Sequence, residues 1–582
     1  SFLSEQELSQ YMVKFLHRME DLCAYNNARL QGAKRNPGRV LPALVYNDAL
    51  FYKGFLLASA IRMNTLAETS PVAGEPYQKL KAIRRRLANL YTMPVADRSG
   101  VGELEEEAAN TEKELSRLLA GYSDASRQVD WREIKSGLKS GEAALEFIHY
   151  QHLFPKPSDR ILYAALLIRP QDEVPVFIPL CEEASLDSIL QVKADRKADY
   201  VNGLYTLADR GAFIPKTPQR TLYELLCKPM EKELTGIQTI YFSPSGLLHR
   251  INLNAIPVNE METLSDRYRL IELTSTRQLV TPNPPVDQNR DAVLYGAVNY
   301  DFDASVQTNE VVAASQSRGS LSFNAADGPQ SKGSWGFLTG TEREVHSIEK
   351  TLQMNGFKVV LAKGENATEA SIKKFGSGLA ASPRVIHIAT HGFFFPDPDR
   401  TNSAEDGMTR DSSSSERTAI AASQNNRQQS IDNSPSGSEF IKSDQPMLRS
   451  GLILAGGNAA WQGQPARKGQ EDGVLTAYEI AQMNLSNTEL VVLSACETGL
   501  GDIQGNEGVY GLQRAFKIAG VKYLIMSLWQ VPDKQTSMLM IAFYKNWLDQ
   551  KMSIPDAFHA AQKELRELGF DPYQWAGFVL IE

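Results

Sequence analysis

The sequence contains few cysteines and no long apolar run. Its four cysteines, Cys23, Cys181, Cys227 and Cys496, lie far apart without CxxC spacing, which argues against a zinc ribbon or a disulfide framework. No stretch approaches the about 18 consecutive apolar residues of a membrane-spanning helix. The first residues, SFLSEQELSQ, show no signal-peptide pattern. We therefore expect a soluble protein of a reducing compartment, the cytoplasm.

The chain also lacks an excess of positive charge. Lys and Arg number 61 against 69 Asp and Glu, which gives a net charge of −8 and a pI near 5.7. This balance argues against a general affinity for nucleic acid or anionic membranes. Arg84, Arg85 and Arg86 follow one another, but such a short run indicates a solvated helix face. No direct nucleic-acid partner is expected.

Length and composition are those of a globular protein with several domains. The 582 residues are 42% apolar and 22% charged, and one hydrophobic core rarely grows to this size. Residues 1–128 are predicted to be helical, and Val45, Ala49, Leu56 and Ala60 recur at helical spacing within residues 43–62. Because the 34-residue pattern of a TPR unit is not found, we expect a helical bundle or the degenerate, TPR-like end of a helical solenoid.

From residue 129 onward, apolar runs alternate with helical patterns. This alternation indicates βαβ units around a mainly parallel sheet. It occurs twice, in residues 129–283 and again in residues 284–582, so we expect two related α/β halves. The clearest strand candidates are EAALEFIHY and RILYAALLI in the first series and VLYGAVNY, RVIHIATHG, GLILAGG and ELVVLSAC in the second.

Two polar segments interrupt the second half. Residues 301–335 are rich in small and polar side chains, and residues 397–446 are poorer still in large apolar ones. Neither can bury enough apolar surface to offset the entropy lost on ordering. Both are expected to be mobile loops.

One histidine and one cysteine stand just past the ends of apolar runs. The run RVIHIATHG ends with His391 and Gly392, and the run ELVVLSAC ends with Cys496. Ligand sites of open parallel sheets form at the carboxyl ends of the strands. If the two strands are neighbours, imidazole and thiol meet at one edge, as a cysteine nucleophile and its base require.

Other interpretations of these residues have to be considered. A cysteine at a strand end is more often a core residue than a nucleophile, and the other three cysteines are expected to be packing residues. His387 and His391 lie four residues apart, but HIATH lacks the Glu of HExxH, and His387 is expected in the core. The loop GLGDIQGNEG lacks the Lys of a phosphate loop. No metal and no cofactor is expected.

The second half resembles a known family. IHIATHGFF, the segment 473–533 and the closing WAGFVLIE resemble the CHAT domain of caspase- and separase-like cysteine peptidases. Residues 239–257, TIYFSPSGLLHRINLNAIP, resemble the first, catalytically silent half of such proteins. The resemblance extends over roughly 130–582, and the leading helices are similar to the often TPR-like helices that precede many bacterial CHAT domains.

This resemblance implies a caspase-like, mainly parallel sheet flanked by helices, with a silent first half and an all-α region before it. It also implies that His391 and Cys496 are a catalytic dyad and that the backbone N–H groups of Gly392 and Cys496 form an oxyanion hole. The reaction would proceed through a thioester acyl-enzyme. No acid adjacent to His391 in sequence offers itself to orient the ring, so backbone carbonyls are candidates for that role.

The resemblance further suggests where the substrate residue before the cut, P1, would bind. In the separase-like branch an acid after the strand that follows the nucleophile meets a basic P1 side chain. Asp533 occupies the comparable position here, and Asp502 is a second candidate; either would favour Arg or Lys. The alternative is that Asp533 caps a helix beginning at Lys534.

The function expected from this resemblance is a regulated cysteine endopeptidase that cleaves specific protein substrates in a bacterial stress or antiviral defence pathway. A sensor protein that engages the helical region would activate it. The long polar insert 397–446 departs from the family pattern and could cover the substrate groove. The alternative is a catalytically inert CHAT scaffold that binds a partner through its helices.

Overall fold

The computed structural model describes most of the chain. The described residues are 4–31, 40–91, 98–120, 129–154, 156–190, 197–205, 221–281, 289–301, 334–375, 380–396, 445–464, 470–496, 498–503 and 508–582. The two expected loops, 301–335 and 397–446, lie outside this set apart from a few residues at their ends.

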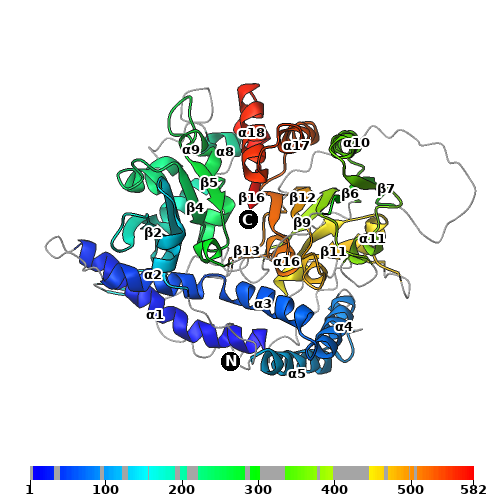
Figure 1. Ribbon diagram of the computed structural model, residues 1–582, viewed down its shortest axis with the longest axis horizontal. Helices are drawn as coiled ribbons and strands as arrows, with labels where there is room; N and C mark the ends of the chain where they lie inside the picture. The colour runs from blue at the N-terminus through cyan, green and yellow to red at the C-terminus, as the bar shows by residue number, and fades with distance from the viewer. Residues whose placement is uncertain are drawn as a thin grey trace, which may run out of the picture.

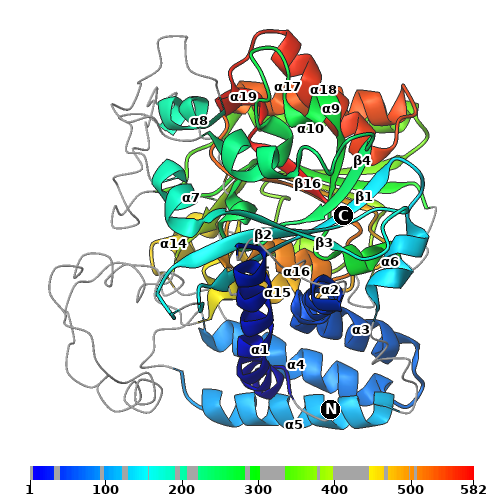
Figure 2. The same ribbon diagram turned by 90° about the vertical axis from the view of Figure 1, so that its left-hand side faces the viewer.

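The N-terminal region is all helical where it is described. Its helices are α1 (Glu5–Gln31), α2 (Val40–Tyr52), α3 (Phe55–Thr69), α4 (Gly74–Tyr91) and α5 (Val101–Ala120). They lie along one side of the sheet, as both ribbon views show (Figures 1 and 2). Helices α4 and α5 share a small core of their own around Tyr77, Leu80, Leu87 and Leu115. None of the helices in the described part of the chain is both long and apolar enough to cross a membrane.

Two expectations for this region were wrong in detail. Residues 43–62 form two helices rather than one, because Gly54 takes a left-handed conformation with φ of 63° after α2 ends. The turn leaves the side chain of Lys53 buried. Arg85 and Arg86 are exposed, as expected of a solvated face, but Arg84 is only 17% exposed and pairs with Glu112 on α5.

One continuous sheet of eleven strands forms the centre of the molecule. In spatial order the strands are β3 (Val176–Glu182), β2 (Ile161–Ile168), β1 (Glu142–Gln151), β4 (Thr239–Ser243), β5 (Arg269–Glu272), β16 (Phe578–Ile581), β15 (Tyr523–Ser527), β12 (Leu490–Ser494), β8 (Val385–Ala389), β6 (Asp291–Val298) and β7 (Lys358–Gly364). Only β1–β2, β2–β3 and β15–β16 are antiparallel pairs. The mainly parallel sheet is thus confirmed.

The two α/β series meet inside this sheet. The closing strand β16 lies between β5 of the first half and β15 of the second, and Ile581 pairs with Glu272 there. Helices α10 (Thr339–Met354), α17 (Asp533–Leu548) and α18 (Ile554–Glu567) lie on the opposite side of the sheet from α1–α5 (Figures 1 and 2). Helices and strands share one apolar core that includes Leu294, Val492 and Phe543.

Shorter helices complete the described architecture. They are α6 (Trp131–Gly137), α7 (Glu183–Leu190), α8 (Lys197–Tyr205), α9 (Leu264–Arg267), α11 (Glu369–Lys373), α14 (Gly457–Trp461), α15 (Ala477–Ile480), α16 (Leu512–Ile518) and α19 (Pro572–Trp575).

One predicted strand lies elsewhere than expected. GLILAGG contributes β10 (Ser450–Ile453), which joins β9 (His391–Phe394) and β11 (Val474–Thr476) in a separate three-stranded sheet. Gly451 permits this packing, because a Cβ there would lie 2.7 Å from the Leu475 carbonyl and from the Phe393 ring. The small sheet therefore begins at His391.

Candidate active site

His391 and Cys496 follow the ends of two neighbouring strands. Strands β8 and β12 pair in parallel, and Ala389 at the end of β8 lies opposite Ser494 at the end of β12. Each candidate residue stands two positions beyond this pair. The condition set in the sequence analysis, that the two strands be neighbours, is met, and both residues follow strand ends at the same edge of the sheet.

The turn that carries Cys496 is fixed to the end of β15. The Ser527 hydroxyl donates a hydrogen bond to the Ala495 carbonyl at 2.6 Å, and the Ser527 N–H donates to Thr498 Oγ1 at 3.0 Å. The Gly499 N–H donates in turn to the Ser527 carbonyl at 2.7 Å. Ser527 is fully buried, so these bonds hold the backbone on both sides of Cys496 in place.

Gly392 lies directly against the same turn. A Cβ at this position would come within 2.7 Å of the Cys496 carbonyl and 2.8 Å of Thr498 Cγ2. Glycine at this position therefore lets β9 approach the Cys496 turn closely. Any larger residue at position 392 would push the Cys496 turn away from β9.

A backbone carbonyl orients the imidazole of His391. His391 Nε2 lies 2.7 Å from the Gly336 carbonyl, and because a carbonyl only accepts, Nε2 carries the proton. The ring is flanked by Tyr300 and Trp335, with ring centroids 5.0 and 4.8 Å away. Nδ1 is thereby the basic nitrogen of the neutral ring.

Burial shifts the protonation of this histidine. It lowers the pKa of His391 to about 4, although the hydrogen bond to Gly336 favours the charged form. The ring should therefore remain neutral through the physiological range and take up a proton only as the pH falls to about 4. NMR of ring-labelled protein, with the signal assigned by His391→Gln, is expected to show that midpoint and the Nε2–H tautomer; a midpoint near 6.5 would contradict this description.

A pocket lined by carboxylates opens beside Cys496. We call it the acidic pocket, and its lining includes Glu344, Thr390, Ser494, Cys496, Asp533 and Thr536. Ser494 is 4% exposed, and its hydroxyl has no hydrogen-bond partner within the described part of the chain. The pocket therefore combines two acids with a buried hydroxyl directly next to the thiol.

Asp533 lines this pocket and does not cap its helix. Helix α17 begins at Asp533 itself, with Pro532 at the N-cap position and no side-chain cap, so the capping interpretation was wrong. The carboxylate instead accepts a hydrogen bond from the Gly340 N–H, while burial and the neighbouring Glu344 charge raise its pKa. Proline before the acid takes the capping position and leaves the Asp533 side chain to face α10.

Glu344 is a pocket residue that the sequence did not reveal. It lies on α10, is 1% exposed, and meets His387 Nε2 at 2.8 Å. His387 Nδ1 lies 3.3 Å from the hydroxyl of Tyr544 on α17, and His387 is fully buried, as expected of a core histidine. Nothing in TEREVHSIEK separates Glu344 from the solvated acids of the same helix, because only its packing against β8 distinguishes it.

Asp502, the second candidate for the P1 pocket, lies elsewhere. It pairs with the guanidinium of the buried Arg449, whose Nε donates to the Phe395 carbonyl at 3.2 Å. Asp502 is not part of the acidic pocket lining. The structure therefore brings Asp533, but not Asp502, to the pocket beside Cys496.

Other thiols and acids offer weaker alternatives. Cys23 and Cys227 are buried, and burial raises the pKa of both thiols. Glu369, Glu471 and Glu479 come close enough to share a metal ion, but Lys373 Nζ bonds all three at 2.5, 2.7 and 2.6 Å. An ammonium group already binds all three carboxylates of this cluster.

Comparison with known proteins gives the following relatives. A model of the CHAT domain family matches residues 216–582. Tetratricopeptide repeat protein 28 of Mus musculus is 34% identical over 111 residues, which are 19% of this chain and 4% of that protein. The protein of the same name from Homo sapiens is 24% identical over 405 residues, or 65% of this chain and 14% of that protein. The chain thus spans a small part of these relatives.

Comparison with solved structures gives matches of low identity and low TM-score. The Arg-specific cysteine proteinase gingipain R (RgpB, Porphyromonas gingivalis) matches 68% of this chain and 69% of its own, with 8% identity and a TM-score of 0.32. The separase–securin complex of Saccharomyces cerevisiae matches 91% of this chain and 37% of its own, with 9% identity and a TM-score of 0.36. The CHAT family model matches more than half of the length of this chain, and the chain therefore belongs to the CHAT domain family.

Proposed function

We propose that this CHAT protein is a cysteine endopeptidase in which Cys496 is the nucleophile and His391 its base. The observation that carries the proposal is the position of both residues just past the ends of two adjacent parallel strands. The hydrogen bond from His391 Nε2 to Gly336 supports it, because it leaves Nδ1 unprotonated for the thiol. The firmly held turn around Cys496 supplies the rigidity that a nucleophile needs.

The reaction follows from these groups. Cys496 loses its proton to His391 Nδ1 while its sulfur attacks the scissile carbonyl, and the backbone N–H groups of Gly392 and Cys496 stabilise the oxyanion. His391 then gives the proton to the leaving amine, which leaves a thioester on Cys496. A water molecule, deprotonated by the same nitrogen, releases the acid.

The acidic pocket supports a preference for a basic P1 residue. Asp533 and Glu344 lie close enough for the charge of one to raise the pKa of the other. An entering guanidinium or ammonium group would remove this repulsion and pair with both carboxylates. The Ser494 hydroxyl offers the same side chain a further hydrogen-bond partner.

A P1 peptide library tests this preference. The wild-type protein is expected to favour Arg or Lys at P1, and Asp533→Asn to reduce that preference by roughly tenfold or more, as expected for a lost charge-assisted bond. Asp549→Asn, which changes an exposed acid directly after the same helix, is the matched control and should leave the preference unchanged. An apolar P1 preference that survives Asp533→Asn would refute this role.

We further propose that a cytoplasmic sensor protein in a bacterial defence pathway regulates cleavage of specific protein substrates. The helical region contacts the second half: Asn64 on α3 donates to the Ile518 carbonyl of α16 at 3.2 Å, and Tyr91 packs on Tyr478. A partner that moves these helices would also move α16, which follows the Cys496 loop in the chain.

The alternative function is an inert scaffold that binds a partner through the same helices. An irreversible thiol-directed peptide probe separates the two functions. The peptidase is expected to be labelled at Cys496 and not in Cys496→Ala. A scaffold would show no labelling of Cys496, with or without the partner protein.

A further inference from the structure

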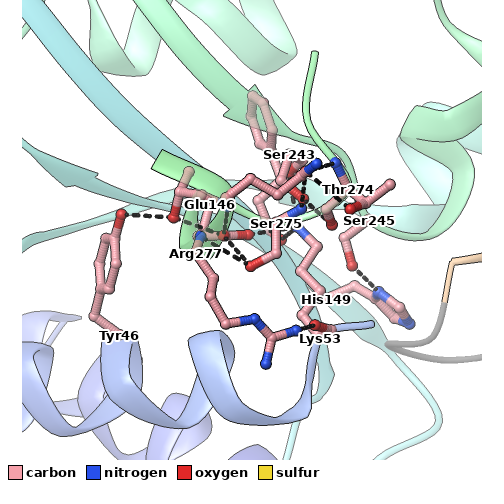
Figure 3. A network of polar contacts seen from close by, with 12 residues as sticks. Tyr46, Lys53, Glu146, His149, Ser243, Ser245, Thr274, Ser275 and Arg277 are labelled. Carbon is pink, nitrogen blue, oxygen red and sulfur yellow. Dashed lines mark hydrogen bonds and ion pairs between the residues drawn. The ribbon is translucent and has the colours of Figure 1, made fainter. Parts of the chain in front are cut away.

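The first half carries a histidine and a serine near the carboxyl ends of two neighbouring parallel strands, an arrangement similar to that of His391 and Cys496. The match is not exact, because His149 stands three residues beyond the paired Glu146 and within β1, whereas His391 stands two beyond Ala389. Strands β1 and β4 are parallel neighbours, with Glu146 opposite Ser243. Ser245 stands two residues beyond Ser243, as Cys496 stands two beyond Ser494. His149 Nδ1 lies 2.7 Å from Ser245 Oγ, and Figure 3 shows this pair at the edge of the sheet.

A cavity lies beside this pair, at the junction of the three parts of the chain. We call it the junction cavity. Its polar lining comes from Lys53 of the helical region, from Ser245, His249 and Thr274 of the first half, and from Gln513 and Arg514 of the second half. Ser245 is 2% exposed, whereas His249 is partly exposed and borders the opening. The cavity has room for a small group but not for a peptide, so the pair does not form a second peptidase site.

Buried cations surround this cavity. Lys53 Nζ, on a side chain only 6% exposed, donates to Glu146 Oε2 and the Phe147 carbonyl at 2.9 Å and to the Ser243 carbonyl at 2.7 Å (Figure 3). Glu146 is shared among several donors, since its Oε1 also accepts from the Ser275 hydroxyl at 3.0 Å. Arg514 is 1% exposed, and its guanidinium lies 3.3 Å from Glu5, a partly exposed acid that also faces Arg84.

The charge of Lys53 acts on both histidines near this cavity. Burial, and then the charge of Lys53, lower the pKa of His149 to about 4 and that of His249 to about 3. Glu146 and Glu272 in turn act on Lys53 and favour its charged form. Both rings are neutral and can each donate one N–H. With its proton on Nδ1, His149 donates to Ser245, whose hydroxyl then points its own proton into the cavity.

We propose that the junction cavity binds a small tetrahedral oxyanion, either free phosphate or the phosphate end of a small metabolite. Ser245 and His249 donate hydrogen bonds to it, and Lys53 and Arg514 supply the balancing charge. The bonds of Lys53 to the backbone of β1 and β4 keep its charge in place without consuming the Ser245 donor. Bound anion would connect the helical region, the first half and the segment that begins at Gly508 after the nucleophile loop.

Calorimetric titration of the full chain with inorganic phosphate, against chloride at equal ionic strength, tests the proposal. Saturable binding at one site is expected at millimolar phosphate or below. Ser245→Ala and His249→Ala should each weaken it by about tenfold or more, as expected for a lost hydrogen bond to a charged group. His346→Ala, which removes an exposed imidazole on α10, should bind phosphate like the wild type.

Two further arms complete the test. A nucleoside monophosphate titrated in parallel distinguishes the sources: binding of both ligands indicates a site open to phosphate esters, and binding of phosphate alone indicates free phosphate. Circular dichroism of each variant establishes that it is folded before titration. No saturable heat with either ligand, or equal affinity in the wild type and both folded cavity variants, would overturn the proposal.

Discussion

Alanine at Cys496 is expected to abolish peptide hydrolysis, and alanine at His391 to reduce kcat/KM by roughly a thousandfold or more. The two side chains act as a unit, because the thiol is a weak nucleophile until the imidazole accepts its proton. The double variant should therefore be no less active than Cys496→Ala alone. The measurement is kcat/KM on a peptide selected from the P1 library.

The control for this experiment is Cys181→Ala. Cys181 is half-buried in β3 of the first half, so its replacement should leave hydrolysis unchanged. Circular dichroism should show that all four variants are folded. Full activity in purified Cys496→Ala would end the assignment of the nucleophile.

Methionine at Lys53 is expected to destabilise the protein by about 3–5 kcal/mol, because it leaves Glu146 as an uncompensated buried charge. The two side chains are 6% and 0% exposed and lie 2.9 Å apart. The shift in the urea unfolding midpoint measures the loss. Glu146→Gln added to Lys53→Met should recover part of it, since the second change removes the stranded charge.

An exposed ion pair gives the matched comparison. Lys79 and Glu107 are also 2.9 Å apart, but their side chains are 56% and 43% exposed. Lys79→Met is expected to change stability by less than about 1 kcal/mol. Two results would contradict the description of a tightly coupled buried pair. One is a loss of stability in Lys53→Met as small as that in Lys79→Met. The other is that the stability changes of Lys53→Met and Glu146→Gln simply add in the double variant.

The sheet was predictable because buried parallel strands have a simple pattern. VLYGAVNY, RVIHIATHG and ELVVLSAC are apolar runs of strand length, and helical segments between such runs leave a parallel sheet as the natural arrangement. The order of the strands was not predictable. Insertion of β16 between β5 and β15 depends on contacts hundreds of residues apart, which leave no local pattern in WAGFVLIE.

In the helical region, the spacing of apolar residues did not reveal where one helix ends and the next begins. Helical spacing continues from Val45 through Leu56, so the sequence predicts one helix. The break depends on the conformation of Gly54, and glycine within a helical pattern is only a weak signal of a break. A lysine is normally expected to be exposed to solvent. Lys53 is buried because backbone carbonyl groups of β1 and β4 accept hydrogen bonds from its ammonium group.

Some residues of the candidate site could be predicted from the sequence and others could not. His391 and Cys496 could be identified because strand ends are visible in the sequence and strand neighbours share an edge. The sequence could not identify three further residues, because each acts through a backbone or side-chain contact with residues far away in the chain. These are Gly336, Glu344 and Ser527. Gly336 in particular follows a polar segment, where nothing marks one carbonyl as the partner of an imidazole.

The central claim is that peptide bonds are cut through a thioester on Cys496, and detection of that thioester tests it most directly. The protein is mixed with peptide esters carrying Arg or Lys at P1, the reaction is stopped with acid, and the intact chain and its peptides are weighed by mass spectrometry. The wild type is expected to gain the acyl mass on the peptide that contains Cys496, and Cys496→Ala to gain none. Acylation at another residue, or ester cleavage that continues in Cys496→Ala, would contradict the claim.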